Sequence, residues 1–537
     1  MSGAVALNAE EMAALLRRVE ERHLREEDWE IVVRLLGTVQ SLAEALEKKR
    51  VSVARLRAMV FGAHTEKTDT VIGEVTEGKK GARPRGGSRA GHGRNGEEAY
   101  WGARRVTVEH AQLKAGQKCP DCGRGKLYPM GKSSPVIWLE GRAPVQATVY
   151  ECEQLRCGGC GKVFSAEAPE HAKARKYDSS VGAIVATLRY GNGMPFHRQQ
   201  QLQRAVGIPL PASVQWQLVV QKAEALLPVH RRLIQHAAQG QLMLVDDTPM
   251  KILEEMGQHG SQSEAEQEAG EERGKKGIRT TAIISSTEVG KIVLYRTGHN
   301  QAGDNMDWLL SQRPKDLGAP IQMCDALAAN LPEQFQVILA NCLSHARRKV
   351  VEVAVAFPRE VALALYTFEQ LYANEELARR QNLSPQERLE FHQLRSGFLM
   401  EGLRAWMQAQ VAAKTVEPNS SLGQAFAYMI KHWEPLTLFL RVPGAPLDNN
   451  LCEQILKRAI LHRKNSLFYK TRRGAEVGDL LMGIITTCIQ HKVDPFRYLT
   501  EAEDHAAEVA ADPEAWLPWN YARREATPIP PPPPRPP

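Results

Sequence analysis

Short apolar runs separated by polar turns mark the middle of the chain. They lie at residues 242–245, 280–284, 292–295, 321–324 and 337–340, and a segment with helical spacing lies at 305–311. Runs of this length, bounded by turn residues, predict buried strands. Residues 254–276 are rich in Gln, Glu, Ser and Gly and predict a mobile polar insertion. The pattern therefore predicts an α/β core at 239–500, with an all-helical insertion at about 345–440.

The first 75 residues show a different period. Apolar residues recur every seven positions, and a second series follows three residues later. β-branched residues in the first series and Leu in the second favour a parallel two-stranded coiled coil, with Lys49 as a polar residue that fixes the register. The alternative is an amphipathic helix that packs on its own chain. The two series are Val32, Val39, Leu46, Val53, Val60 and Leu35, Leu42, Lys49, Leu56.

Three further regions are defined by composition. Residues 76–104 are rich in Gly, Arg, Lys and Ser and predict a flexible basic linker. Residues 173–238 read as helical, and the break at Gly207 between two helical patterns resembles a helix-turn-helix, a weak indication of groove binding. Residues 501–537 are assigned to a C-terminal tail with a Pro-rich end, which has little capacity to form a core.

Two CxxC pairs lie between the linker and the helical region. They are formed by Cys119 with Cys122 and by Cys157 with Cys160. Four thiolates at this spacing predict a structural zinc ribbon at 105–172, with no open coordination position for catalysis. The ribbon either contacts DNA or only stabilises the fold as a structural zinc site. Cys152 is interpreted as a buried thiol outside the ribbon.

Composition narrows the class of protein. The chain has 537 residues, 43% hydrophobic and 24% charged, which is ordinary for a globular protein of several domains. A net charge of +7 and a pI of about 8.8 suit a polyanionic partner. No apolar stretch is long enough for a membrane span, and no secretory signal is recognisable. Nine cysteines, four of them in CxxC pairs, favour metal binding in a reducing cytoplasm over disulfides.

Acidic residues at three distant places carry the candidate chemistry. Asp246 follows the first apolar run, Asp325 follows a later one, and Glu453 lies in a segment with helical spacing. Separate carboxylates that converge can hold two divalent cations on either side of a phosphodiester. Taken singly, each acid is more simply a turn, capping or solvated residue.

The flanking motifs resemble those of the IS66-type insertion-sequence transposases. The chain has Asp246-Asp247-Thr248-Pro249, where that family has Asp-Glu-Thr-Pro. It also has the family's Cys-x-x-His-Ala-Arg-Arg at 342–348, Asp-Asn-Asn-x-x-Glu at 448–453 and Arg-Lys-Asn at 463–465. The resemblance implies a multidomain α+β protein with a ribonuclease H-like catalytic core. It also implies Asp246, Asp325 and Glu453 as ligands for Mg²⁺ or Mn²⁺, and it agrees with the Zn²⁺ ribbon.

Basic residues near these motifs are candidates for DNA contacts, because cations neutralise phosphates. They are Lys457, Arg463, Lys464, Arg472, Arg473, Arg347 and Arg348. Lys457 follows Glu453 by four residues and could instead form an ion pair with it. His345 and Cys342 could be a metal pair, although a packed histidine is the simpler interpretation.

The resemblance implies a DDE transposase that cuts element ends and joins them to target DNA. Expected partners are DNA, further copies of the chain and accessory proteins of the same element, in the bacterial cytoplasm with the nucleoid. Two other functions stay open: a non-catalytic DNA-binding regulator derived from a transposase, and a structure-specific nuclease.

Overall fold

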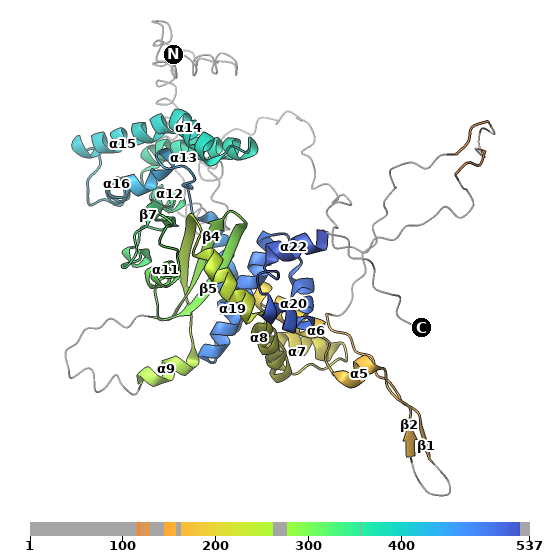
Figure 1. Cartoon of the computed structure of the whole chain (residues 1–537). Helices are drawn as coiled ribbons and strands as arrows, with labels where there is room; N and C mark the ends of the chain where they lie inside the picture. Colours follow the sequence, from red (N-terminus) through yellow and green to blue (C-terminus); the bar gives the residue numbers. More distant parts are fainter. Residues whose placement is uncertain are drawn as a thin grey trace, which may run out of the picture. The chain divides into compact units, whose positions relative to one another are not determined.

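The computed structural model describes residues 115–118, 120, 122, 124–127, 144–156, 163–260, 277–354 and 356–526 (Figure 1). The chain divides into two compact units. The larger unit contains residues 177–199 and 211–537, and the smaller contains 81–176 and 200–210. The expected coiled coil at 1–75 lies outside the described residues, as do the basic linker and three of the four ribbon cysteines.

In the smaller unit, two short strands form an antiparallel hairpin, β1 (Gln154–Arg156) and β2 (Val163–Ser165), and α5 (Glu170–Ala174) follows them. Cys122 is the one predicted zinc ligand among the described residues, and its side chain is exposed. Cys152 is also exposed, which contradicts its interpretation as a buried thiol. It follows an extended segment of exposed residues, where no core surrounds it.

A five-stranded mixed sheet lies at the centre of the larger unit, with strand order β5-β4-β3-β6-β7. The pairs β5–β4 and β4–β3 are antiparallel, and β3–β6 and β6–β7 are parallel. All five apolar runs of the sequence analysis are confirmed as strands. They are β3 (Leu242–Pro249), β4 (Arg279–Thr287), β5 (Gly290–Gly298), β6 (Ile321–Cys324) and β7 (Ile338–Asn341).

Helices cover both faces of the sheet, and side-chain contacts show which helix lies on which face. On one face, Tyr295 of β5 donates a hydrogen bond to the Ile455 carbonyl of α18 (Asn450–Ser466). Thr297 contacts Asp479 of α19 (Arg472–Gln490) on the same face. On the other face, Ser285 of β4 donates to the Ala237 carbonyl of α8 (Ala212–Ala237). Strands covered on both faces are buried in their central residues, which explains their apolar runs.

Helices before and after the sheet segment belong to this unit, except for residues 200–205 of α7 (Phe196–Ala205) and the turn at Gly207, which fall in the smaller unit. The two helical patterns around Gly207 are confirmed as helices, and Gly207 has a φ of +77° between them. Residues 501–526, assigned from sequence to a tail, are largely helical and bury Trp516, Leu517 and Trp519. These elements are α6 (Ser179–Ala186), η2 (Thr187–Gly191), α7 (Phe196–Ala205), α20 (Pro495–Asp504), α21 (Ala506–Ala511) and α22 (Pro518–Ala526).

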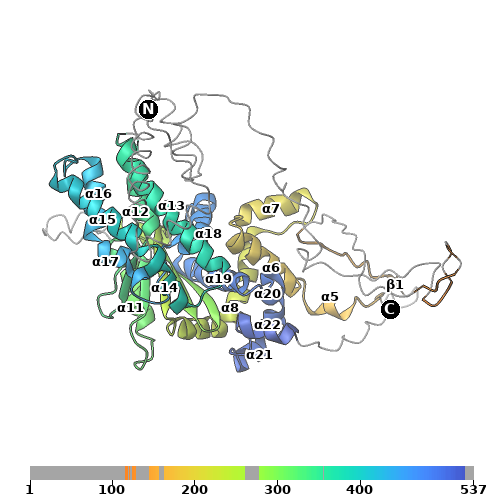
Figure 2. The same cartoon turned by 90° about the horizontal axis from the view of Figure 1, so that it is seen from above.

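The predicted all-helical insertion is confirmed and forms a group of helices beside the sheet (Figures 1 and 2). Ser384 and Glu387 form a capping box at the start of α14, with Pro385 in the first turn. The insertion contains α12 (Leu343–Glu352), α13 (Pro358–Arg380), α14 (Pro385–Arg395), α15 (Gly397–Ala412), α16 (Ser421–Lys431), α17 (Trp433–Leu436) and η4 (Leu438–Leu440).

Part of the polar insertion predicted at 254–276 is helical instead. Helix α9 spans Leu253–Gly260, and residues 261–276 lie outside the described chain. The helix begins where Ile252 forms a parallel bridge with Tyr469, and Leu253 donates from its backbone to the Tyr469 carbonyl at 3.0 Å. A contact with a segment more than 200 residues away therefore anchors the start of this helix.

Between β5 and β6, helix α11 (Ala302–Leu310) lies on the α8 side of the sheet, because Asn305 donates to the Thr281 hydroxyl at 2.8 Å. This helix confirms the helical segment predicted at 305–311. Gly303 allows α11 to approach the segment after β6. A Cβ at this position would meet the carbonyl oxygen of Leu331 at 2.2 Å.

Candidate active site

Asp246 and Asp325 lie at equivalent positions of two neighbouring parallel strands. Leu244 of β3 is paired with Met323 of β6, and each acid follows two residues later. The carboxyl ends of parallel strands meet at one edge of a sheet, which is where α/β proteins commonly place their sites. The strand pairing therefore brings these two predicted acids to one edge.

Glu453 reaches this edge from the first turn of α18. The side-chain amide of Asn449 donates a hydrogen bond to the Val245 carbonyl at 2.9 Å, which ties the start of α18 to β3. In the same first turn, the Cys452 thiol points at the Leu244 carbonyl, 3.7 Å away. These two contacts fix the helix against the strand that carries Asp246.

Asp246 lies close enough to the other two acids to be influenced by their charge. Burial, followed by the charges of Asp325, Glu453 and Asp247, raises the pKa of Asp246 to about 7. A hydrogen bond from the Asp247 backbone N–H, 2.8 Å long, opposes the rise. Like charges gathered in a partly buried place favour the protonated acid. The site therefore concentrates negative charge around Asp246.

Residues that follow β6 hold the carboxylate of Asp325 in place by hydrogen bonds. Its carboxylate accepts hydrogen bonds from the backbone of Leu327 at 3.3 Å and from the Asn330 side chain. The Asn330 carbonyl in turn accepts from Gln322 at 2.6 Å. Burial raises the pKa of Asp325, and the Leu327 amide and the charge of His345 oppose that rise. Sequence reasoning missed Asn330, because an Asn in a loop carries no signal for a contact with an acid five residues earlier.

Glu453 has two basic neighbours on α12. Its Oε1 lies 3.7 Å from Nδ1 of His345, and its Oε2 lies 3.7 Å from a guanidinium nitrogen of Arg348. These contacts are longer than a hydrogen bond, so they steer the carboxylate by charge. The two helices meet because the backbone N–H of Leu343 donates to the Leu447 carbonyl at 3.0 Å.

The neighbouring acids have structural partners. Asp247 accepts a hydrogen bond from Arg279 of β4 at 2.8 Å. Alternation along β3 sends it to the face opposite Asp246. Asp448 accepts hydrogen bonds from the backbone and the side chain of Asn450, the first residue of α18.

The predicted DNA-contacting residues fall into two groups. Lys457 and Lys464 lie on the exposed side of α18, and Arg348 is partly exposed next to Glu453. The remaining four have structural partners or are buried. Arg463 bonds Thr248 and the Pro249 carbonyl, Arg472 pairs with Glu255, Arg473 pairs with Glu224, and Arg347 is only 8% exposed.

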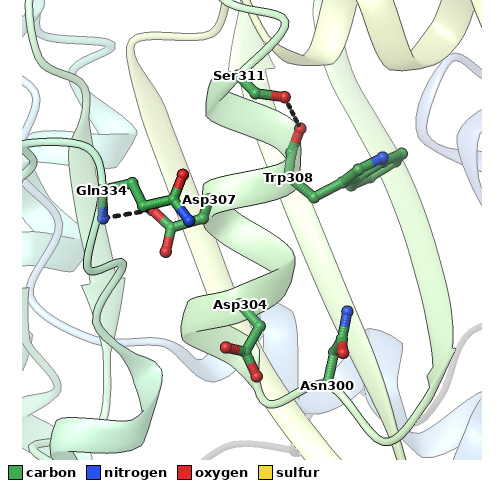
Figure 3. A pocket seen from close by; sticks show the side chains of 6 residues that line it. All are labelled: Asn300, Asp304, Asp307, Trp308, Ser311 and Gln334. Carbon is green, nitrogen blue, oxygen red and sulfur yellow. Dashed lines mark hydrogen bonds between the residues drawn. The ribbon is translucent and has the colours of Figure 1, made fainter.

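A polar pocket of about 360 Å³ lies on α11 (Figure 3). Its acids have structural partners. Asp307 accepts backbone hydrogen bonds from Glu333 and Gln334, each 2.9 Å long, and Asp304 closes a capping box with Gln301. The guanidinium of Arg296 stacks over Trp308 at 4.0 Å. The polar residues of the pocket therefore have a structural role: Asp307 attaches α11 to the segment after β6, and Asp304 caps the helix.

The donor set at the sheet edge fits a divalent cation. Carboxylate oxygens are the ligands that Mg²⁺ and Mn²⁺ prefer. Burial and the charges of the surrounding acids raise the pKa of Asp246 to about 7, and a positive ion would be stabilised at such a carboxyl group. Asp246, Asp325 and Glu453 together therefore suit the metal that the sequence predicts.

Fold and site together define a class: mixed α+β proteins that gather carboxylates from two strand ends and a helix at one edge of a mixed sheet. Within this class, the family described as "Transposase IS66 family" matches residues 175–477. That span exceeds half of the chain, so the chain belongs to this family, and the resemblance seen in its motifs is confirmed. Family membership gives it a transposase role in general terms.

Curated relatives are similar over much of their length. An uncharacterized protein, y4hP, of Sinorhizobium fredii (strain NBRC 101917 / NGR234) is 25% identical over 451 residues, which are 78% of this chain and 76% of the relative. A second, y4jD, of the same organism is 23% identical over 519 residues, which are 90% of this chain and 96% of the relative.

Among the described helices of this chain, none combines the length and apolar character that a membrane crossing requires.

Proposed function

We propose that this protein is a DDE transposase that cleaves DNA at the ends of an insertion sequence and transfers the cut strand to target DNA. Asp246, Asp325 and Glu453 are its catalytic acids on a ribonuclease H-like core. The observation that carries the proposal is the strand register that brings Asp246 and Asp325 to one edge of the sheet, together with the Asn449 contact that ties the helix of Glu453 to the strand of Asp246. A fold has little structural reason to gather three acids that repel one another.

The three acids together provide the oxygen ligands of the proposed metal site. Asp246 and Asp325, at the two strand ends, provide fixed oxygen ligands for Mg²⁺, and Glu453 supplies a third from a helix. Bound Mg²⁺ supplies a Lewis acid that stabilises charge on the phosphate and lowers the pKa of an attacking hydroxyl or water. Asn330 and the Leu327 amide orient Asp325, and Asn449 fixes the helix of Glu453 on β3. The residues thus hold the acids in place before substrate binds.

DNA is the partner that the basic side of the site fits. Lys457 and Lys464 are exposed on the helix that begins with Glu453. Residues 454–475 contain no acid, so the negative charge of the site stops at the first turn of α18. A phosphate backbone lying along this helix would meet cations directly beside the catalytic acids. The proposed zinc ribbon, coiled-coil dimer and accessory proteins of the element would act together with this surface.

Strand transfer with purified protein tests the proposal. With Mg²⁺ and a duplex that carries the element end, wild-type protein should cut and join DNA. Asp246→Asn should lose at least about 1000-fold in rate, because an amide removes the charge but keeps the shape. It should still bind the duplex in a gel-shift assay. Asp316→Asn, the same change at an exposed position of the loop before β6, serves as the matched control and should keep full activity.

Two other outcomes would replace the proposal. Binding of the duplex without cleavage by wild-type protein under any divalent cation would favour the non-catalytic regulator. Cleavage of branched DNA irrespective of the end sequence would favour the structure-specific nuclease.

A further inference from the structure

A second set of donor atoms lies beside the catalytic acids and shares one of them. Cys342 Sγ, a ring nitrogen of His345 and a carboxylate oxygen of Glu453 all lie within 4.8 Å of one another. Cys342 precedes the first turn of α12, and His345 follows it by three residues within that turn. Glu453 faces them from the first turn of α18. Two helix starts therefore bring a thiol, an imidazole and a carboxylate together.

Two atoms of this cluster are buried without a hydrogen bond. Glu453 Oε1 and His345 Nδ1 are both shielded from solvent, and they lie 3.7 Å apart. Buried polar atoms are nearly always hydrogen-bonded, so two of them facing each other require an explanation. In a tetrahedral zinc site with bonds of about 2.0–2.3 Å, neighbouring ligand atoms lie roughly 3.4 Å apart. The observed separation is close to that value.

The sulfur of Cys342 is positioned as an acceptor. It is buried and receives the backbone N–H of Asn449 at 3.2 Å. Burial raises the pKa of the Cys342 thiol to about 11, and the Asn449 backbone N–H opposes this rise. A coordinated cation deprotonates a thiol outright. The donors at Asp246 and Asp325 are oxygens, whereas this cluster combines sulfur, nitrogen and oxygen. Thiolate and imidazole ligands select Zn²⁺ over Mg²⁺.

We propose that Cys342, His345 and Glu453 bind Zn²⁺, and that an ion held there inhibits DNA cleavage by withdrawing Glu453 from Asp246 and Asp325. The three protein ligands leave a fourth position for water. The binding half of the proposal stands on the donor cluster alone. The inhibitory half rests on the proposed function, because only there does Glu453 act with the other two acids.

Cobalt binding tests the site directly, because thiolate-bound Co²⁺ gives a charge-transfer absorption. Full-length protein is stripped of metal and titrated with Co²⁺. Relative to wild type, Cys342→Ala should bind one ion fewer with a thiolate signal. Cys488→Ala removes a buried thiol of α19 outside the cluster and should leave the titration unchanged. Cysteines elsewhere in the chain contribute equally to all three proteins, so the difference reports on Cys342.

Two further variants keep the test independent of any folding defect in Cys342→Ala. His345→Gln and Glu453→Gln should each weaken the Co²⁺ site by about tenfold or more. Co²⁺ titrations that coincide for wild type, Cys342→Ala and Glu453→Gln would overturn the proposal. In that case His345 is only a packing neighbour of Glu453.

Zinc inhibition tests the second half. With Mg²⁺ in excess, the Zn²⁺ concentration that halves the cleavage rate should rise about tenfold or more in Cys342→Ala. Each protein is compared with its own rate without Zn²⁺. Equal sensitivity of wild type and Cys342→Ala to Zn²⁺ would refute the inhibitory role. If wild-type protein cleaves no DNA at all, the proposed function fails, and the cobalt titration still decides whether the site exists.

Discussion

At the scale of single residues, Asp246 carries a stability cost that function would explain. Its carboxylate is partly buried and surrounded by the charges of three other acids, and its strongest partner is a backbone N–H. Catalytic residues commonly lower the stability of the folded protein, because their arrangement serves the reaction. Replacing such a residue by a neutral one of the same shape should therefore stabilise the metal-free protein.

Asp246→Asn should raise the melting temperature of metal-free protein at pH 8 by about 2 °C or more, because it removes charge repulsion and keeps an oxygen for the Asp247 amide. Thermal unfolding in a chelating buffer measures the shift. Asp316→Asn should leave the melting temperature unchanged. A lower melting temperature for Asp246→Asn would show that the carboxylate is stabilising and that the acids do not repel one another.

The sequence could supply the identity of the acids but not their neighbours. Asp246, Asp325 and Glu453 were found from their motifs, and the strand register then places two of them together. The approach of His345 to Glu453 depends on how α12 meets α18, more than 100 residues later in the chain. Arg347 and Arg463 lie in basic motifs, yet tertiary packing gives them structural positions. Charge in a sequence does not reveal which side of a helix faces solvent.

At the scale of elements, the apolar runs predict the five strands of the sheet, and the structure differs from the prediction only at the ends of the strands. The apolar run that predicts the first strand ends at residue 245. The strand itself continues to Pro249, since Thr248 and Pro249 are paired with Thr280 and Arg279 of β4. Pairing across the sheet therefore overrides the polar character of the acids and holds Asp246 in a rigid element.

The end of α18 stores backbone strain. Leu467 has a φ of +69° and a ψ of −39°, and the Phe468 N–H donates to the Ser466 carbonyl at 2.9 Å. This is the rare, strained form of the γ-turn. The Leu467 side chain is 63% exposed, so it contributes little burial.

Leu467→Gly should stabilise the protein by about 1 kcal/mol, because glycine adopts a positive φ without a Cβ clash. The shift would appear as a higher denaturation midpoint in urea. Leu461→Gly, in the middle of the same helix, should be destabilising. If Leu467→Gly lowers the midpoint, the leucine side chain contributes more to the fold than its exposure indicates.

Asp479 of α19 links this helix to β5 through the Thr297 backbone and hydroxyl, at 2.6 and 2.7 Å. Burial raises its pKa to about 7, from an unfolded value near 4. Between these values the folded protein holds a proton that the unfolded chain releases, so stability falls as pH rises from about 4 to about 7. Asp479→Asn should flatten this dependence, as seen in melting temperatures at pH 5 and pH 8. An unchanged slope in the variant would assign the pH dependence to other groups.

At the scale of the whole molecule, distant segments build one unit. Lys222 of α8 is fully buried, donates to the Leu499 carbonyl at 2.9 Å and pairs with Glu503. Nothing in the local sequence around Lys222 indicates a partner nearly 300 residues away, so the helices after residue 495 were partly assigned to a tail. The coiled coil and zinc ribbon remain predictions, because their residues lie largely outside the described chain.

Truncation distinguishes a tail from an integral part of the fold. A chain that ends at residue 500 loses Trp516, Leu517 and the Glu503 partner of Lys222, and it should be insoluble or melt at least about 10 °C lower. A chain that ends at residue 526 should behave like the full-length protein. Equal melting temperatures for the two truncated chains would mean that these helices contribute nothing to stability.

The central claim is that three acids from separate elements share divalent cations. Anomalous diffraction from crystals soaked in Mn²⁺ tests it most directly. The account predicts manganese peaks bonded to carboxylate oxygens of Asp246, Asp325 and Glu453, and their loss in Asp246→Asn crystals. Strong manganese peaks elsewhere, with none between these three side chains, would contradict it.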